Sequence, residues 1–360
     1  MRLLICAGGT GGGVYPALAV HSALTTKVLD VDTLWVGGEG GMEEALVKRQ
    51  GITFKSIPAA GLHGVSLPTL PGNLVKMGRG VFAARRILKA FKPDVLFFTG
   101  GYVAVPMALS GRSIPSLLYV PDIEPGAALK SLTGFADAIT VTTEQSQRYF
   151  DKKVIETGYP LRADLVLWDR ETAHRHLGIS GERPVLLVFG GSKGARSINM
   201  TVLKDLRPIL EMFEVIHLSG ELDWNYVKHH RDQLPKELAA RYHAMPYLHE
   251  MGAALAAADM VVSRAGASCL GEYPLFGLPA ILVPYPHAWR YQKVNADYLT
   301  QRSAAIILED QFLNDELLNT LKVLMDNPNK LQAMRAAMFE LSHPRAAEKI
   351  ASALIELAGE

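Results

Sequence analysis

The chain has 360 residues and a formal net charge of +1, with 49% hydrophobic and 20% charged residues. This length exceeds one ordinary hydrophobic core, so we expect two globular domains. The near-neutral charge gives no general attraction to nucleic acid, and only two cysteines, Cys6 and Cys269, exclude a disulfide framework or a cysteine-rich metal site. No apolar run reaches the about 18 residues that span a bilayer, and the first run is too short for a signal peptide. We therefore expect a cytoplasmic protein that can still bind a membrane surface.

Short apolar runs alternate with helix-length amphipathic segments, a pattern that predicts α/β units with parallel sheets. The strands expected in a first sheet are residues 3–7, 33–36, 95–99, 116–120 and 138–142. The strands expected in a second sheet are residues 185–189, 215–218, 260–263, 280–283 and 304–308. Helices are expected at 15–24, 42–50 and 74–91, with a last helix at about 345–358. Glycine and proline at 158–160 mark the boundary between the two halves.

Four glycine-rich turns follow predicted strands, at residues 7–13, 98–103, 189–196 and 263–268. Glycine lets the backbone adopt a positive φ and approach a ligand closely, and a helix that begins at such a turn offers N–H groups to a phosphate. Glu272 follows the fourth turn at a spacing that suits an acid accepting hydrogen bonds from ribose. No turn has the P-loop sequence, and the first lacks a clean dinucleotide fingerprint, so a nicotinamide cofactor is the weaker interpretation.

These turns belong to an ordered set of motifs that runs along nearly the whole chain. The motifs are Gly8-Gly9-Thr10-Gly11-Gly12, Gly100-Gly101-Tyr102-Val103, Gly158-Tyr159-Pro160-Leu161-Arg162, Gly190-Gly191-Ser192-Lys193-Gly194-Ala195-Arg196, Arg264-Ala265-Gly266-Ala267-Ser268 with Glu272, and Gln292-Lys293-Val294-Asn295-Ala296. The set resembles the MurG-type transferases, cell-wall enzymes that add N-acetylglucosamine to lipid I to make lipid II.

The resemblance implies an α/β fold of the GT-B class, in which two Rossmann-like domains with parallel sheets face each other across a cleft. It implies an N-terminal, membrane-associated acceptor domain at residues 1–160 and a C-terminal domain for the UDP-sugar at residues 161–342. The helix at residues 343–360 is expected to pack back on the first domain.

The resemblance also assigns residues to UDP-N-acetylglucosamine (UDP-GlcNAc). Ser192 and the turn at 266–268 would hold the diphosphate, Leu248 the uracil through its backbone, and Glu272 the ribose, while Gln292 and Asn295 would contact the sugar hydroxyls. The full set expected at this substrate is Thr10, Gly11, Gly12, Asp122, Arg162, Ser192, Leu248, Gly266, Ala267, Ser268, Cys269, Leu270, Gly271, Glu272, Gln292 and Asn295. No cofactor and no obligatory metal are expected, because backbone N–H groups and helix dipoles would stabilise the leaving diphosphate.

The acceptor side is expected on the first domain. A polyprenyl-diphosphate-linked acceptor would place its diphosphate at Gly12, Gly13, Gly100, Gly101 and Tyr102. Residues 45–93 contain no Asp or Glu, and basic side chains alternate with apolar ones at about residues 73–92. This composition is typical of a helix that lies on an anionic membrane, so the protein is expected at the cytoplasmic face of the membrane as a peripheral protein. A basic surface helix with an ordinary core face is the alternative.

The catalytic base is the point where this chain departs from the family. Gly13 stands where members usually carry a histidine, and residues 119–122 read Tyr-Val-Pro-Asp in place of His-Glu-Gln-Asn. Asp122 and Glu124 are therefore the candidate bases that would take the proton from the acceptor hydroxyl, and a helix cap is the alternative role for both. Other histidines in the chain, His21, His63 and His287, are weaker candidates.

Three functional alternatives stay open at this stage. The first is a GT-B transferase that uses a different lipid or small-molecule acceptor. The second is an enzyme of the UDP-GlcNAc epimerase type, which would leave the basic segment unexplained. The third is a sugar-nucleotide-binding protein with impaired catalysis.

Overall fold

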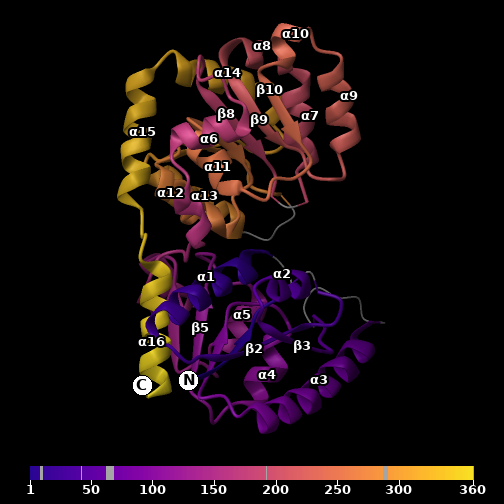
Figure 1. The fold of residues 1–360 in the computed structure, drawn as a ribbon, viewed down its shortest axis with the longest axis vertical. Helices are drawn as coiled ribbons and strands as arrows, with labels where there is room; N and C mark the ends of the chain where they lie inside the picture. The colour runs from indigo at the N-terminus through magenta and orange to yellow at the C-terminus, as the bar shows by residue number, and fades with distance from the viewer. Residues whose placement is uncertain (9–10, 42, 62–68, 192, 287–290, 360) are drawn as a thin grey trace. The chain divides into compact units, whose positions relative to one another are not determined.

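The structure is a computed structural model that describes residues 1–8, 11–41, 43–61, 69–191, 193–286 and 291–359. It contains two compact units, Met1–Arg162 with Pro344–Glu360, and Ala163–His343. Each unit is a parallel β-sheet covered by helices (Figure 1). The predicted fold class, α/β with two Rossmann-like domains, is confirmed.

The sheet of the first unit has seven strands in the order β3-β2-β1-β4-β5-β6-β7. Its central strands β4 and β5 are buried along their whole length, because helices cover both faces of the sheet. The strands are β1 (Arg2–Cys6), β2 (Asp32–Gly38), β3 (Thr53–Ile57), β4 (Val95–Phe98), β5 (Ser116–Val120), β6 (Ala138–Val141) and β7 (Ile155–Glu156).

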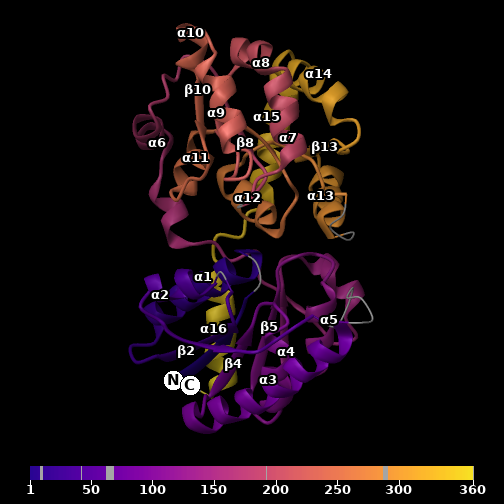
Figure 2. The ribbon, with the colours of Figure 1, turned by 90° about the vertical axis from the view of Figure 1, so that its right-hand side faces the viewer.

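Two apolar clusters hold helices against the two faces of this sheet. One cluster joins the sheet to α1, α2 and α16, and Ile350 and Leu354 of α16 are fully buried in it. The other cluster joins the sheet to α3, α4 and α5, and α3 lies beside α4 in Figure 2. The helices are α1 (Gly11–Lys27), α2 (Glu43–Arg49), α3 (Leu70–Phe91), α4 (Ala104–Ser110), α5 (Ala127–Leu132), the 3-10 helix η2 (Glu144–Tyr149) and α16 (Ala346–Ala358).

The first helix begins earlier than the sequence suggests. We expected it from about residue 15, but α1 starts at Gly11, inside the glycine run. Pro16 therefore lies in the second turn of the helix and not at its start. The early start places Gly11, Gly12 and Gly13 in the first turn, where backbone N–H groups have no acceptor within the helix.

The sheet of the second unit has six strands in the order β10-β9-β8-β11-β12-β13. The strands are β8 (Val185–Phe189), β9 (Glu214–Leu218), β10 (Tyr242–Met245), β11 (Met260–Ser263), β12 (Ala280–Leu282) and β13 (Ala305–Ile307). The helices are η3 (Ala163–Leu167), α6 (Arg170–Leu177), α7 (Arg196–Lys204), α8 (Leu206–Met212), α9 (Trp224–Asp232), α10 (Lys236–Ala239), α11 (Met251–Ala257), η4 (Ala267–Leu270), α12 (Glu272–Phe276), α13 (Tyr291–Gln301), α14 (Leu313–Met325) and α15 (Pro328–Glu340).

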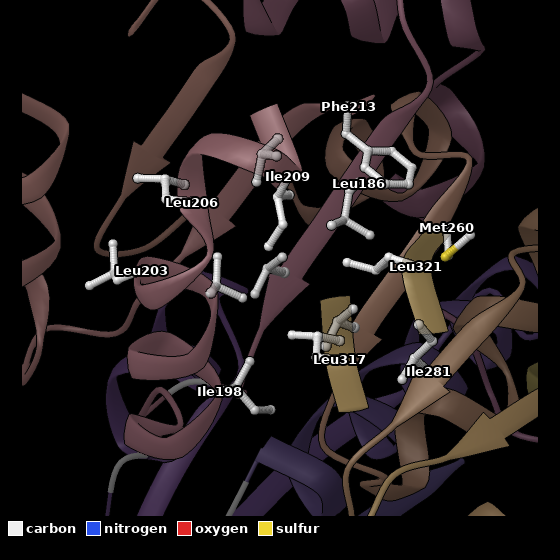
Figure 3. Packing of buried hydrophobic residues seen from close by; sticks show 14 of the residues in the cluster. Leu186, Ile198, Leu203, Leu206, Ile209, Phe213, Met260, Ile281, Leu317 and Leu321 are labelled. Carbon is white, nitrogen blue, oxygen red and sulfur yellow. The ribbon is translucent and has the colours of Figure 1, made fainter. Parts of the chain in front are cut away.

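The core of the second unit lies between this sheet and the helices α7, α8 and α14 (Figure 3). Leu186 of β8, Ile209 of α8 and Leu321 of α14 are fully buried there. Aliphatic side chains from sheet and helix thus remove one face of the sheet from water, which is the main source of stability for such a layer. The packing keeps the carboxyl ends of the strands in fixed positions, and the candidate site is built on these ends.

Candidate functional site

Each sheet has a topological switch point, where the strands that follow in the chain lie on opposite sides of the first strand. In the first sheet β2 and β3 lie to one side of β1, and β4 to β7 lie to the other. In the second sheet β9 and β10 lie to one side of β8, and β11 to β13 lie to the other. Ligands of open parallel sheets bind outside the carboxyl ends of the strands at such a switch point. The four glycine-rich turns follow β1, β4, β8 and β11, so they flank these two points.

The two turns of the first unit are in direct contact. A Cβ atom at Gly101, which has φ +84°, would lie 2.7 Å from the carbonyl oxygen of Gly8. The hydroxyl of Thr99 donates to the carbonyl oxygen of Gly13 at 2.6 Å. Gly100 also has a positive φ, +142°. Glycine is thus required at Gly101 for its conformation and for the close approach of the two backbones.

The candidate residues for the acceptor diphosphate lie together around this contact. Gly12 and Gly13 are in the first turn of α1, and Gly100, Gly101 and Tyr102 follow β4. There is little space for a side chain at Gly13, because a Cβ atom there would be 3.3 Å from the carbonyl oxygen of Thr99. Thr10 lies outside the described residues.

Tyr119, which stands where the resemblance led us to expect a histidine, is buried in β5. Burial raises the pKa of its hydroxyl well above the usual value, so it stays protonated. The hydroxyl pairs with Thr142 Oγ1 at 2.7 Å, and Thr142 donates in turn to the carbonyl oxygen of Pro121 at 2.7 Å. Tyr119 therefore acts as a structural support for the segment that leads into Asp122.

The two candidate bases follow Pro121, the residue whose carbonyl oxygen Thr142 holds. Asp122 and Glu124 lie just beyond the carboxyl end of β5, and both are partly buried. Glu124 Oε1 lies 4.0 Å from the ammonium group of Lys130. Arg162, expected at the sugar nucleotide, lies with its guanidinium carbon 4.7 Å from the centre of the Tyr15 ring on α1.

The other histidine and cysteine side chains of this region that the structure describes are poor bases or nucleophiles. Burial lowers the pKa of His21, whose Nε2 lies 3.1 Å from Thr33 Oγ1. Burial, together with the Glu43 carboxylate, raises the pKa of the Cys6 thiol far above its usual value. His63 and His287 lie outside the described residues.

The first turn of the second unit packs against the loop after β9. Gly191 and Gly194 have φ of +90° and +77°, and the N–H group of Gly194 donates to the carbonyl oxygen of Gly191 at 2.9 Å. A Cβ atom at Gly220 would lie 2.6 Å from the nitrogen of Gly194. The turn is thus held closely at the start of α7. Ser192, the expected diphosphate contact in this turn, lies outside the described residues.

The second turn of this unit, at residues 263–268, can present backbone groups to a ligand, because most of its side chains are small or buried. Ala267, Cys269 and Leu270 are buried, while Gly266 and Ser268 are partly exposed. The N–H groups of Cys269 and Gly271 already donate within the turn, to the carbonyl oxygens of Gly266 and Ser268. The groups left for a diphosphate are therefore at the start of the turn, and Glu272 follows as the first residue of α12.

The remaining candidates lie on loops and helices at the same edge of the second sheet. Asn295 of α13 is fully buried, and its Nδ2 donates to the carbonyl oxygen of Ala265 at 3.1 Å. Gln292, also on α13, accepts through Oε1 from the backbone N–H of Tyr285 at 2.8 Å. Leu248 lies in the loop after β10 and is partly buried.

Three residues of this edge were not predicted as part of the site. Arg264, Ser197 and Asp310 form a hydrogen-bonded cluster that joins the connections after β8, β11 and β13. The sequence does contain one indication of this cluster, which is Arg264. An arginine directly after a buried strand needs an acidic partner. The sequence did not reveal which of the many acids it pairs with.

The described residues contain neither a metal-binding cluster nor a membrane-spanning helix. Within the residues that the structure describes, no group of three or more His, Cys, Asp or Glu side chains has the arrangement of a metal site. Across the same residues, none of the helices combines the length and the hydropathy needed to cross a bilayer.

Models of two protein-family domains match the chain. The glycosyltransferase family 28 N-terminal domain matches residues 3–140, and the glycosyltransferase family 28 C-terminal domain matches residues 185–350. The chain belongs to glycosyltransferase family 28.

Relatives within family 28 extend this match to the full length. The chain is 38% identical to a protein of Roseiflexus sp. (strain RS-1), covering 98% of this chain and 94% of the relative. It is 37% identical to a protein of Desulforudis audaxviator (strain MP104C), covering 100% and 99%. Both relatives are named UDP-N-acetylglucosamine--N-acetylmuramyl-(pentapeptide) pyrophosphoryl-undecaprenol N-acetylglucosamine transferase. These similarities place the chain among the MurG-type members of family 28.

Solved structures agree with this assignment. MurG of Acinetobacter baumannii matches with a TM-score of 0.78 and 26% identity over 99% of both chains. The UDP-GlcNAc 2-epimerase of Neisseria meningitidis has a TM-score of 0.70 and 14% identity, covering 99% of this chain and 100% of the epimerase. At such low identity the second likeness shows the fold alone.

Proposed function

We propose that this protein is an inverting hexosyltransferase that moves N-acetylglucosamine from UDP-GlcNAc to undecaprenyl-pyrophosphoryl-N-acetylmuramyl-pentapeptide (lipid I). The product is lipid II, an intermediate of peptidoglycan synthesis. The observation that carries this proposal is the full-length similarity, at 37–38% identity, to relatives that are named for this reaction. The glycine-rich turns at both switch points support it, because the reaction needs one diphosphate site for each substrate.

The UDP-sugar is assigned to the second unit. Backbone N–H groups at the start of the 266–268 turn, together with Ser192, bind the diphosphate. Glu272 accepts hydrogen bonds from ribose, and Leu248 contacts the uracil through its backbone. Gln292 contacts the sugar through its amide group. Asn295, also expected at the sugar, is fully buried and instead holds the neighbouring turn through its hydrogen bond to Ala265. The carboxyl-edge position of the described members of this set supports the assignment.

The acceptor is assigned to the first unit. Its diphosphate binds at Gly12, Gly13, Gly100, Gly101 and Tyr102, where two backbones meet and N–H groups of the α1 terminus are available. A negative group is favoured there by the positive end of the α1 dipole. This polar site suits the diphosphate part of the acceptor, while the polyprenyl chain requires an apolar environment.

Helix α3 provides the membrane contact in this proposal. Leu74, Val75 and Phe82 are 53%, 63% and 66% exposed, which is unusual for apolar side chains of this size on one helix. Basic side chains surround them on the same helix, and all are exposed: Lys76, Arg79, Arg85, Arg86 and Lys89. Exposed apolar groups with neighbouring cations match an anionic bilayer surface. The protein would thus reach its lipid-linked acceptor as a peripheral protein on the cytoplasmic face of the membrane.

The chemical step is a single displacement. Asp122 or Glu124 takes the proton of the acceptor hydroxyl, whose oxygen attacks the anomeric carbon of N-acetylglucosamine. The bond between that carbon and the diphosphate oxygen breaks, and UDP leaves with the electron pair. The attack from the opposite side inverts the configuration at the anomeric carbon. Backbone N–H groups of the second unit stabilise the charge that grows on UDP, so we expect no metal requirement.

The test is transfer of labelled N-acetylglucosamine from UDP-GlcNAc to a lipid I analogue. We expect a lipid II product with an inverted, β-configured linkage, and the same rate in the presence of EDTA. Transfer only to other hydroxyl compounds would instead support a different acceptor. Formation of the 2-epimer from UDP-GlcNAc without any acceptor would support epimerase chemistry. The chain resembles the solved UDP-GlcNAc 2-epimerase in fold alone.

A further inference from the structure

Arg264 follows β11, and three polar groups hold its guanidinium. NH1 donates to Asp310 Oδ1 at 2.6 Å and to the carbonyl oxygen of Val283 at 3.1 Å. NH2 donates to Ser197 Oγ at 2.8 Å, and the Ser197 hydroxyl donates to Asp310 Oδ1 at 2.7 Å. The Arg264 and Asp310 side chains are only 11% and 23% exposed. In such a setting each charge depends on the other, because little water reaches the pair to replace a lost partner.

The four residues come from four different connections at one edge of the sheet. Ser197 follows the glycine turn after β8, Arg264 follows β11, Val283 follows β12, and Asp310 follows β13. In the proposed function the first two connections hold the diphosphate, and the third leads to the sugar contacts on α13. Asp310 is on the fourth, to which no ligand contact is assigned. Its carboxylate therefore acts on the site through Arg264 and Ser197.

The same guanidinium also supports Tyr285. Its central carbon lies 5.2 Å from the centre of the Tyr285 ring, a distance at which a cation is attracted to the ring face. The backbone N–H of Tyr285 donates to Gln292 Oε1 at 2.8 Å. A backbone nitrogen only donates, so the atom that faces it must be the amide oxygen of Gln292. The NH2 group of Gln292 is consequently directed away from Tyr285.

We propose that Asp310 is a positioning residue for the sugar end of the UDP-sugar. By fixing Arg264, Asp310 fixes Tyr285 and orients Gln292 so that its NH2 group donates to a hydroxyl oxygen of the bound pyranose. This inference rests on the proposed function, in which Gln292 contacts the sugar. It adds a selective requirement: loss of Asp310 weakens recognition of the sugar more than recognition of the nucleotide. The nucleotide is assigned to Leu248, Glu272, Ser192 and the backbone N–H groups of the 266–268 turn, none of which depends on the orientation of Gln292.

The test is calorimetric titration of the full chain with UDP-GlcNAc and, separately, with UDP. Asp310→Asn keeps the side-chain shape and removes the charge that holds Arg264. We expect the dissociation constant of UDP-GlcNAc to rise about tenfold, which is about 1.4 kcal/mol, and that of UDP to rise less than about threefold. Equal weakening of both ligands, or unchanged affinity for UDP-GlcNAc, would overturn the inference.

A matched control is available on the same sheet. Asp259 pairs with Arg170 at 2.7 Å and with Arg335 at 3.5 Å, but it precedes β11 and so lies at the opposite, amino edge. Asp259→Asn makes the same chemical change in an ion pair of the same unit. We expect it to leave both dissociation constants within about twofold of the wild type, since it lies outside the ligand edge.

A second variant keeps the inference testable if Asp310→Asn does not fold. Tyr285 is 46% exposed, so Tyr285→Ala removes the ring that Arg264 supports with little loss of buried surface. We expect the same selective weakening of UDP-GlcNAc, and unchanged affinity in this variant would decide against the inference. If the folded wild-type protein binds no UDP-GlcNAc at all, the proposed function is contradicted. If the wild-type protein binds UDP-GlcNAc and the variants bind it equally well, only the role of Asp310 is contradicted.

Discussion

The backbones of Gly8 and Gly101 approach so closely that a single added methyl group at Gly101 would lie 2.7 Å from the Gly8 carbonyl oxygen. The two residues belong to turns that follow neighbouring strands, β1 and β4. Any side chain at Gly101 must therefore push these turns apart, and they carry the proposed acceptor diphosphate site.

Gly101→Ala is expected to destabilise the first unit and to weaken the acceptor site. The cost combines a positive φ with a backbone clash and should reach at least about 2 kcal/mol in the free energy of unfolding. Gly100→Ala is the control, because Gly100 also has a positive φ but no atom within 4 Å of its Cβ position. Urea denaturation of both variants checks this. Equal losses of stability would show that the close approach to Gly8 is unimportant.

Replacement of the catalytic base should lower turnover without lowering affinity for the UDP-sugar. We expect either Asp122→Asn or Glu124→Gln to reduce kcat by about 100-fold or more. KM for UDP-GlcNAc should change little, because the amide of each variant keeps an acceptor oxygen in place, including at Asp122, which is also expected near the UDP-sugar. Asp137→Asn is the matched control. Asp137 accepts from the backbone N–H of Ser116 at 2.9 Å, at the opposite end of the same strand β5. Wild-type turnover in both base variants would rule out these two carboxylates.

Membrane binding should depend on the exposed face of α3. Replacing Arg79 and Arg86 together by Gln removes two cations and should weaken binding to vesicles by about 2 kcal/mol, or about 30-fold. Co-sedimentation with vesicles that contain phosphatidylglycerol measures this. Replacement of Lys322 and Lys330 by Gln, on α14 and α15, removes the same charge from exposed positions elsewhere and should have little effect. Equal losses in the two double variants would contradict a specific role of α3.

The stability of the second unit should depend on pH through His217. This side chain is fully buried and forms hydrogen bonds with the side chains of Tyr242 and Asn199. Burial lowers the pKa of His217 from 6.5 to about 4. Between these two values the unfolded state binds a proton that the folded state does not bind. The free energy of unfolding should therefore fall as the pH drops from about 6.5 to about 4, by up to roughly 3 kcal/mol.

Chemical denaturation at several pH values isolates this effect. His217→Gln should flatten the pH dependence, whatever its effect on stability at neutral pH. His229→Gln is the control, because His229 is exposed on α9 and should leave the slope unchanged. A wild-type slope in the His217 variant would assign the pH dependence to other groups.

The fold was predictable from sequence because the central strands of both sheets are continuous apolar runs. The strands that sequence patterns missed, β3, β7 and β10, all lie at an edge of a sheet. An edge strand is covered by fewer neighbours, so its sequence needs fewer apolar residues: Thr53, Lys55 and Ser56 of β3 are exposed, as are both residues of β7. Periodicity carries little signal in such segments.

The candidate site was predictable only in part, for a different reason. Glycine-rich turns stand out in sequence because their backbone conformation restricts the residue type. The cluster of Ser197, Arg264 and Asp310 does not, since it joins residues far apart in the chain through side-chain hydrogen bonds. The support that Tyr119 gives to Pro121 through Thr142 is equally invisible, because it depends on the register of β5 and β6.

Helix α16 has a consequence for the order in which the protein acquires its structure. Ile350, Ala351 and Leu354 complete an apolar cluster with Leu3, Val20 and Trp35, so residues from both ends of the chain share one core. During synthesis the first unit emerges early but lacks this final layer until the whole second unit has been made. Apolar surface along α1 must stay exposed over that interval. A chaperone that binds nascent apolar segments is therefore expected to associate with the first unit for longer than with the second.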